Sequence, residues 1–290
     1  TVSNIPGSFS VDQLEVGLYH ACAISTTGGA WCWGYHLNGR LGITAGSSVL
    51  QPTATSSLGG TGRTVSAGGL HTCVVLTNDT VTCFGRNNRG QLGQNTTTTE
   101  NATPTTVALS ATASAVSAGN EFTCALLTTG AVECFGANGV GQLGAGTTST
   151  SRYAPGAVSG LSGTVVDIVA GTTHACAVMS TGEVRCWGEN ATGELGVGNT
   201  DPSYSAVAIA SLNIMPTTTT TSTTTTTVDY HDNNNYDHND HHNNYDHNNK
   251  HIFNYHSSHI TNKKDKDHAH SLTRGAQDQR SKHCSERVVC

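Results

Sequence analysis

The residues most able to do chemistry in this sequence are four pairs of cysteines that share one spacing. The midpoint of each pair falls on a turn, and the next position holds a residue that tolerates left-handed backbone: Gly28, Asp79, Gly130 or Gly182. Folding a hairpin about these midpoints sets the paired cysteines opposite one another, near enough to bond. The spacing therefore predicts four disulfides. The paired residues, ten positions apart, are Cys22 and Cys32, Cys73 and Cys83, Cys124 and Cys134, and Cys176 and Cys186.

Two other interpretations of the cysteines stay open. Reduced thiols buried as small apolar side chains are typical of a cytosolic protein. A zinc site is less favoured, because the nine residues between paired cysteines exceed the usual spacing and two sulfurs per copy do not close a site. We favour disulfides because all eight repeat cysteines pair without a remainder, as in an oxidising compartment.

A histidine stands two positions before the first cysteine in three copies, at His20, His71 and His174. Phe122 takes this position in the third copy, so the position does not require a ligand atom. We therefore expect a packing or hydrogen-bonding role inside each repeat, with no catalytic residue and no metal. The stretch 139–144 spells a dinucleotide-binding fingerprint, but threonine and serine follow it instead of a helix pattern. We therefore expect no cofactor.

The elements that must position these residues are copies of one repeat. The first cysteines of successive pairs fall 51, 51 and 52 positions apart, a period typical of propellers and solenoids. Each copy has a short strand that ends in glycine, the cysteine hairpin and a Gly-x-Leu-Gly turn. An aromatic residue and a glycine follow each second cysteine, at Trp33-Gly34, Phe84-Gly85, Phe135-Gly136 and Trp187-Gly188. We expect these positions and the three histidines to be structural positions of the repeat.

This pattern resembles the regulator of chromosome condensation repeat, in an exported, bacterial-type variant with paired cysteines. The resemblance covers residues 11 to about 210 and implies an all-β fold, a seven-bladed β-propeller with four-stranded blades. Four repeats of about 51 residues are present, so we expect part of such a propeller. The expected domain spans 1–214, with a partial repeat at 1–16 and full repeats at about 17–67, 68–118, 119–170 and 171–214.

The composition changes after the last repeat. Residues 215–228 form a threonine-rich linker, and we expect 229–290 to be a disordered, low-complexity tail. Every residue from 229 to 249 is Asp, Tyr, His or Asn, the only residues that threonine codons give when read out of frame as N-A-C. We therefore hypothesise that the tail is a shifted-frame translation of a longer threonine linker. Metal binding by its 11 histidines is the less favoured alternative.

Charge and hydropathy exclude several classes of function. Residues 1–228 carry six arginines, no lysine and eleven acidic residues, and so a net charge of −5, which disfavours nucleic-acid binding. No run of about 18 apolar residues is present, so we expect no membrane span. The acidic residues are scattered and no catalytic motif appears. We therefore expect that the protein is not an enzyme.

These observations predict a non-enzymatic binding or scaffold module, exported or at the cell surface, whose partner is a protein or a glycan. Three variable segments, 44–57, 95–106 and 147–160, are expected to be loops that form its binding face. Two alternatives stay open. One is guanine-nucleotide exchange on a small GTPase, which the resemblance implies and which needs a cytoplasmic location. The other is inhibition of a secreted enzyme.

Overall fold

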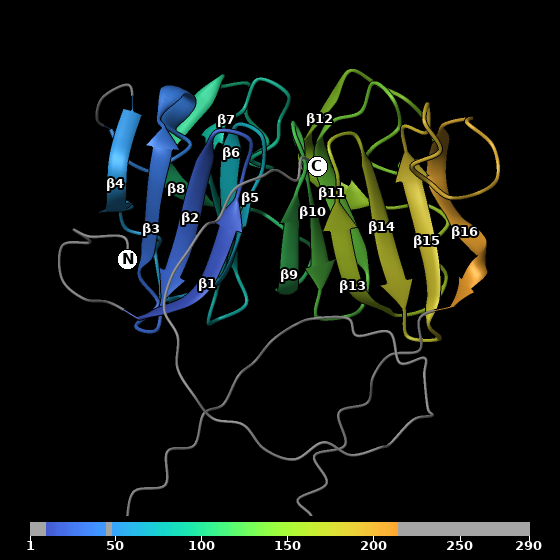
Figure 1. Cartoon of the computed structure of the whole chain (residues 1–290), viewed down its shortest axis with the longest axis horizontal. Coiled ribbons are helices and arrows are strands. Elements are labelled where there is room, and N and C mark those ends of the chain that lie inside the picture. Colours follow the sequence, from blue (N-terminus) through green and yellow to red (C-terminus); the bar gives the residue numbers. More distant parts are fainter. Residues whose placement is uncertain (1–9, 45–47, 214–290) are drawn as a thin grey trace, which may run out of the picture. The chain divides into compact units, whose positions relative to one another are not determined.

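The strands in the described part of this protein form four antiparallel sheets of four strands each (Figure 1). The structure is a computed structural model that describes residues 10–44 and 48–213. Each sheet is contiguous in the chain, and its strands lie in sequence order. The predicted all-β fold is therefore confirmed. The linker at 215–228 and the tail at 229–290, with the frame hypothesis, lie outside the described residues.

The four sheets have equivalent strands. Sheet 1 consists of β1 (Val11–Val16), β2 (His20–Ser25), β3 (Ala30–Tyr35) and β4 (Ser48–Ala54), with the 3-10 turn η1 (Leu37–Gly39) after β3. Sheet 2 consists of β5 (Gly62–Ala67), β6 (His71–Leu76), β7 (Val81–Arg86) and β8 (Glu100–Thr106). Sheet 3 consists of β9 (Ala113–Ala118), β10 (Phe122–Leu127), β11 (Val132–Ala137) and β12 (Ser151–Ala157). Sheet 4 consists of β13 (Val165–Ala170), β14 (His174–Met179), β15 (Glu183–Gly188) and β16 (Ser203–Asn213).

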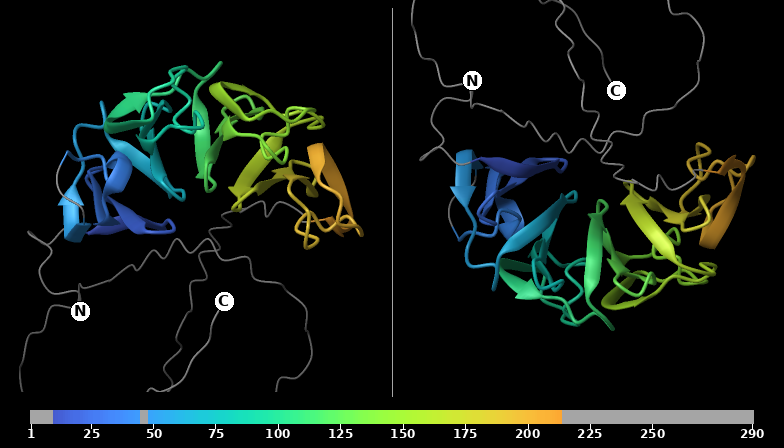
Figure 2. Two further views of the ribbon diagram at one scale, coloured as in Figure 1. Left: turned by 90° about the horizontal axis from the view of Figure 1, so that it is seen from above. Right: turned by 90° about the horizontal axis from the view of Figure 1, so that it is seen from below.

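The sheets follow one another along an arc, with the first strand of each on the inner side (Figure 2). Neighbouring first strands lie side by side, because β1 contacts β5, β5 contacts β9 and β9 contacts β13. The sheets therefore pack as propeller blades do, face to face about a common axis. Each sheet begins one strand before the repeat boundary that was predicted from the sequence. Residues 11–16 open sheet 1 instead of standing apart as a partial repeat, and 62–67 open sheet 2.

The central hairpin of each sheet has the register that the cysteine spacing predicts. The residue after each midpoint has left-handed backbone, with φ of 80° at Gly28 and 63° at Asp79. Glycine adopts this conformation without strain, and aspartate tolerates it better than most residues. The two cysteines of every pair lie opposite one another across the hairpin. Cys22 faces Cys32, Cys73 faces Cys83, Cys124 faces Cys134 and Cys176 faces Cys186.

The core lies between the sheets. The cysteines share one face of each sheet, here called its disulfide face, and the residue after the second cysteine lies on the opposite, aromatic face. Phe84 of sheet 2 packs in one buried cluster with Cys22 and Cys32 of sheet 1. Phe135 and Trp187 pack in the same way on the disulfides of sheets 2 and 3. We call each such contact a joint, and three joints link the four sheets.

The prediction that three variable segments are loops was wrong for about half of each segment, because those residues form the outermost strand of a sheet. These strands are β4, β8 and β12, which pair with β3, β7 and β11. Most of their side chains are exposed or only partly buried, and threonine and other polar residues replace an alternating apolar pattern. An edge strand without that pattern resembles a loop in the sequence.

Candidate functional site

Each predicted cysteine pair is joined by a disulfide in the structure, with Cα atoms 4.0–4.1 Å apart. The four bridges are Cys22–Cys32, Cys73–Cys83, Cys124–Cys134 and Cys176–Cys186. The predicted pairing agrees with the structure at every position.

Burial keeps three of the four disulfides away from any surface that could hold a ligand. Seven of the eight bridged cysteines are at most 1% exposed, and both Cys83 and Cys134 are completely buried. Cys83 packs in the joint between sheets 2 and 3, and Cys134 packs in the joint between sheets 3 and 4. Cys176 is partly exposed, because no described sheet covers the disulfide face of sheet 4. The first three bridges lie inside joints, so they belong to the scaffold that positions a site.

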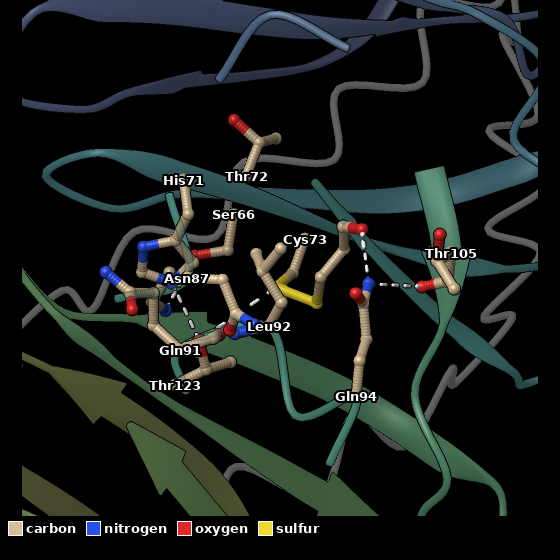
Figure 3. The surroundings of a disulfide bond; sticks show 12 residues. Ser66, His71, Thr72, Cys73, Asn87, Gln91, Leu92, Gln94, Thr105 and Thr123 are labelled. Atoms are coloured by element: carbon tan, nitrogen blue, oxygen red, sulfur yellow. Dashed lines mark hydrogen bonds between the residues drawn. A yellow bond between two sulfur atoms is a disulfide. The ribbon is translucent and has the colours of Figure 1, made fainter. Parts of the chain in front are cut away.

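Histidine connects sheet 1 to sheet 2 and sheet 2 to sheet 3. His20 Nε2 lies 2.7 Å from Oγ1 of Thr72, and His71 Nε2 lies 2.7 Å from Oγ1 of Thr123 (Figure 3). The Thr72 hydroxyl donates to the Arg40 carbonyl at 2.9 Å, so its oxygen accepts a hydrogen bond and histidine Nε2 donates. The partner lies in the next sheet, 52 positions away, and not inside the same repeat as expected. The ring crosses the joint because its strand faces the neighbouring sheet.

Burial keeps both of these histidines neutral. Desolvation, together with the Arg40 charge, lowers the pKa of His20 to about 4. Desolvation, together with His20, lowers the pKa of His71 to about 3. Neither ring has the pKa near 7 that a general acid or base needs at neutral pH. Their chemistry is therefore that of a neutral hydrogen-bond donor within the scaffold.

The joint between sheets 3 and 4 uses different residues. Phe122 occupies the histidine position, and Ala175 occupies the threonine position across the joint. The Trp187 indole donates to the Gln142 carbonyl at 3.0 Å. The aromatic position that the sequence marks as structural thus carries the hydrogen bond in this joint.

The remaining predicted positions are glycines and two residues on the outer faces. Gly136 has a φ of 118°, and a Cβ atom there would lie 2.5 Å from the Glu121 carbonyl oxygen. His174 and Trp33 lie on the outer faces of sheets 4 and 1, which no described sheet covers. The glycines equivalent to Gly136 have the same backbone conformation, at Gly34, Gly85 and Gly188.

A hollow of about 290 Å³ lies where the ends of the four first strands converge. It is lined by small residues from equivalent positions of all four sheets, among them Gly17, Gly68, Gly119 and Gly171. Glycine is needed there because a Cβ atom on Gly68 would clash with the Gly119 carbonyl oxygen. We call the surface about this hollow the turn face. It consists of the turns after the first strands (17–19, 68–70, 119–121 and 171–173) and the residues that end or follow the third strands.

The first copy gives the turn face an apolar patch. The Tyr35 amide donates to the Tyr19 carbonyl and brings the two loops together. Leu18, Tyr19, Tyr35 and Leu37 are 59%, 59%, 41% and 48% exposed, and we call these four residues the tyrosine patch. The Arg40 guanidinium lies 5.8 Å from the Tyr19 ring centroid and 5.1 Å from that of Tyr35. Because Arg40 is only 1% exposed, a buried cation holds both rings in place.

The other copies give the turn face charged groups. Arg86 and Arg89 of the second copy lie 3.9 Å and 3.8 Å from the Glu121 carboxylate of the third copy. In the fourth copy the Thr173 hydroxyl donates to the Glu189 carboxylate. The turn face therefore changes from apolar in the first copy, through an ion pair, to acidic in the fourth.

Sequence reasoning missed the tyrosine patch and the threonines that accept a hydrogen bond from histidine. One signal was present, because Arg40 stands in the Gly-x-Leu-Gly turn where the other copies have Gln91, Gln142 and Glu194. Tyr19 and Tyr35 are sixteen positions apart, so only the hairpin register brings them together. The tyrosine patch therefore could not be recognised without knowledge of the fold.

Residues 10–44 and 48–213 hold neither a cluster of metal ligands nor a membrane-spanning helix. No group of three or more His, Cys, Asp or Glu side chains gathers there in a way that would hold a metal ion. No helix within the same residues has the length and apolar character to cross a membrane.

The four sheets, linked by equivalent joints, define a propeller-type repeat protein. The chain belongs to the regulator of chromosome condensation (RCC1) repeat family. One family model matches residues 11–40, 63–91, 113–142 and 165–194, once in each sheet, and a second matches 78–126 and 129–178. The predicted resemblance is confirmed.

Individual proteins that are similar to this chain agree with the family assignment. The human probable E3 ubiquitin-protein ligase HERC4 is 34% identical over 207 residues, which cover 68% of this chain and 19% of HERC4. The chain thus spans about a fifth of the length of that relative. Among solved structures, human WBSCR16 matches 70% of this chain and 54% of its own with a TM-score of 0.65 at 22% identity. Yeast RCC1 (Prp20), solved with Kap60 bound, covers 70% and 49% with a TM-score of 0.64 at 18% identity. These structural matches show the fold.

Proposed function

We propose that the four-sheet unit is a non-enzymatic protein-binding module that uses the tyrosine patch as its anchor. The patch carries this proposal because all four of its large side chains are exposed and its two tyrosine rings lie over one buried arginine. Tyrosine and other large apolar side chains supply much of the binding energy at protein interfaces. Contiguous exposed apolar residues mark such interfaces on folded proteins.

The repeat fold itself does not need these side chains. Glu121 and Ala137 occupy the positions of Tyr19 and Tyr35 in the third copy, and the same backbone hydrogen bond joins them. Apolar residues in the first copy are therefore free to serve a partner. A protein partner is favoured over a glycan by yeast RCC1, a relative in fold that was solved with Kap60 bound.

The four disulfides support an exported or cell-surface location for this module, because such bonds persist in oxidising compartments. Non-reducing peptide mapping of protein from its native host tests the location. Recovery of the Cys22–Cys32 bridge and its three counterparts supports export. Eight free thiols would overturn it and make nucleotide exchange on a cytoplasmic GTPase the function to test.

The binding role is tested by comparing partner capture by the native protein and by a Tyr19→Ser/Tyr35→Ser variant in extracts of the native host. We expect the variant to lose a protein that the native chain retains. Leu50→Ser is the matched control, because Leu50 is 92% exposed but lies in β4, the outermost strand of its sheet. A partner held equally by all three proteins would contradict a binding role for the patch.

Inhibition of a secreted enzyme stays a narrower form of the same proposal. An inhibitor would form a stable complex with one enzyme through the turn face and abolish that enzyme's activity. A nucleotide-exchange factor would instead accelerate nucleotide release from a purified small GTPase. The two assays therefore separate the alternatives whatever the first partner proves to be.

A further inference from the structure

The first copy departs from the other three at two positions of the loop that follows its third strand. At the first position the other copies have an asparagine, whose side-chain oxygen accepts a hydrogen bond from the leucine N–H of the Gly-x-Leu-Gly turn at 2.9–3.1 Å. The first copy has His36 there, and Nδ1 of this buried ring has no hydrogen-bond partner among the described residues. The three bonded pairs are Asn87 and Leu92, Asn138 and Leu143, and Asn190 and Leu195.

The second position is that of Arg40, where the change reverses the polarity of the side chain. In the other copies the side-chain oxygen accepts a hydrogen bond from the backbone N–H two positions earlier, at 2.9–3.1 Å. Arginine has no acceptor atom, and its Nε donates to the Leu37 carbonyl at 2.8 Å instead. Asn38, two positions before Arg40, has a left-handed φ of 66°. The residues at this position in the other copies are Gln91, Gln142 and Glu194.

The charge of Arg40 is buried without a counter-ion. The residue is 1% exposed, and its Nη1 has no hydrogen-bond partner. None of the ion pairs among residues 10–44 and 48–213 includes this guanidinium. Desolvation lowers the pKa of Arg40, and the nearby charge of Arg86 has the same effect. Because arginine stays charged at neutral pH, the first copy keeps an uncompensated buried charge, which is unfavourable.

Two exposed rings cover this charge. The rings of Tyr19 and Tyr35 lie over the Arg40 guanidinium and meet edge to face, with their centroids 6.3 Å apart. The two tyrosines are 59% and 41% exposed, and exposed side chains change rotamer within nanoseconds. A turn of either ring about its Cα–Cβ bond would uncover the guanidinium. An anion that enters there would gain the ion pair that the chain itself does not supply.

The surroundings of the tyrosine patch favour a negatively charged partner group. Arg86 and Arg89 lie on the same turn face, although the chain as a whole has a net charge of −6. The nearby carboxylates already have partners, because Glu121 lies within 3.9 Å of both arginines. Glu100 accepts a hydrogen bond from Asn38 Nδ2 at 2.8 Å. An acidic group that approaches the patch is therefore attracted by the unpaired guanidinium.

We propose that the tyrosine patch binds an acidic side chain of its protein partner, an aspartate or a glutamate whose carboxylate pairs with Arg40. This inference rests on the proposed function and names the chemistry of the partner. A hydrogen bond between guanidinium and carboxylate is about twice as strong as a bond between neutral groups. Leu18 and Leu37 add apolar surface that would exclude water from the pair. The partner therefore carries its acidic residue beside an apolar one.

Short random peptides selected on the full native chain supply probes without knowledge of the partner. Dependence on the patch is measured by loss of binding to the Tyr19→Ser/Tyr35→Ser variant. We expect the peptides that depend on the patch to share an aspartate or a glutamate beside an apolar residue. The leading peptide is then synthesised in two forms, one with its acidic residue and one with the corresponding asparagine or glutamine.

A double-mutant cycle with these two peptides tests the ion pair. Arg40→Gln gives the first copy the residue type of Gln91 and Gln142. Arg89→Gln is the matched control, because it removes a cation of the turn face that already has Glu121 beside it. We expect the native chain to bind the amide peptide at least about tenfold more weakly than the carboxylate peptide. Arg40→Gln should bind both peptides within about twofold of each other, whereas Arg89→Gln should keep most of the difference.

The outcomes separate the acidic chemistry from the proposed function. If peptides that depend on the patch bind equally well as carboxylate and as amide, the ion pair is wrong and the binding role of the patch stands. If no selected peptide depends on the patch, both are contradicted. Displacement of the carboxylate peptide by inorganic phosphate, but not by sodium chloride of equal ionic strength, would overturn the proposal in favour of a small free anion.

Thermal unfolding of Arg40→Gln tests whether the arginine has a purely structural role. Because the change removes an uncompensated buried charge, we expect the melting temperature of the full chain to stay the same or to rise. Glutamine can also accept the backbone N–H that arginine cannot, as Gln91 and Gln142 do. A fall of more than about 3 °C would show that Arg40 stabilises its loop, and it would overturn the inference that this charge awaits a partner.

Discussion

Sheets 2 and 3 have the same strands, hairpins and disulfides as sheets 1 and 4, yet their repeat residues are far more completely buried. Phe84 and Phe135 are 0% exposed, whereas Trp33 at the equivalent position of sheet 1 is partly exposed. Val65 is 5% exposed and its counterpart Leu14 is 57% exposed. A repeat therefore supplies half of two joints, and its stability depends on its neighbours.

The test with the largest expected effect is reduction of the disulfides. Each bridge joins cysteines ten positions apart, and the chain-entropy estimate is about 2–3 kcal/mol for each. We expect reductant to lower the melting temperature strongly. Mass spectrometry should show Cys176–Cys186 opening first because Cys176 is partly exposed, and the buried bridges Cys73–Cys83 and Cys124–Cys134 opening later. An unchanged melting temperature, or simultaneous opening of all four bridges, would contradict the contrast between central and outer sheets.

The second test makes the same truncation in a central and an outer sheet. Phe84→Ala removes a fully buried ring from a joint, so we expect a loss of about 3–5 kcal/mol in the free energy of unfolding. Trp33→Ala removes a larger but partly exposed ring, and the expected loss is less than about 2 kcal/mol. Denaturant unfolding of both variants measures the difference. Equal losses would show that the aromatic face of sheet 1 is covered after all.

The third test is the pH dependence of stability to which the buried histidines of the joints contribute. The pKa of His20 is lowered to about 4 and that of His71 to about 3, both from an unfolded value of about 6.5. The unfolded chain therefore binds more protons than the folded chain below about pH 6.5, so stability is lost as pH falls. Each histidine contributes a slope of up to about 1.4 kcal/mol per pH unit between its two pKa values.

A variant separates this effect from the titration of carboxylates. His71→Phe with Thr123→Ala and Phe135→Trp gives the joint between sheets 2 and 3 the residue types found in the joint between sheets 3 and 4. Denaturant unfolding from pH 7 to pH 4 should then show a shallower slope than in the native protein, by about one histidine's share. An identical slope would mean that the joints do not hold histidine in its neutral form.

The sequence predicted local features of the fold well because their spacing is short. The register of Cys22 with Cys32 and the left-handed turn at Gly28 each depend on residues within one repeat. The all-β class followed from repetition of that unit. The strand at 48–54 and its counterparts β8 and β12 were missed because an exposed edge strand does not need an apolar pattern.

The joints and the tyrosine patch depend on contacts between distant positions. His20 and Thr72 are 52 positions apart, so the partner is hidden until the order and facing of the sheets are known. The correlated change at Phe122, Ala175 and Trp187 was present in the aligned repeats, but it has meaning only once these residues are seen to share a joint. A change at one position of a repeat can therefore indicate which residues it packs against in the neighbouring sheet.

The smallest expected effect concerns the one hairpin turn of the four that lacks glycine in its left-handed position. Asp79 has a φ of 63° and its carboxylate lies 2.7 Å from the Arg63 guanidinium. Asp79→Gly relieves backbone strain but removes a partly exposed ion pair worth at most about 1 kcal/mol. We therefore expect a net change below about 1 kcal/mol in the free energy of unfolding. Asp79→Ala loses the ion pair and keeps the strain, so denaturant unfolding should show it to be the less stable of the two variants. If alanine were as stable as glycine there, backbone strain would not decide why the other three copies have glycine.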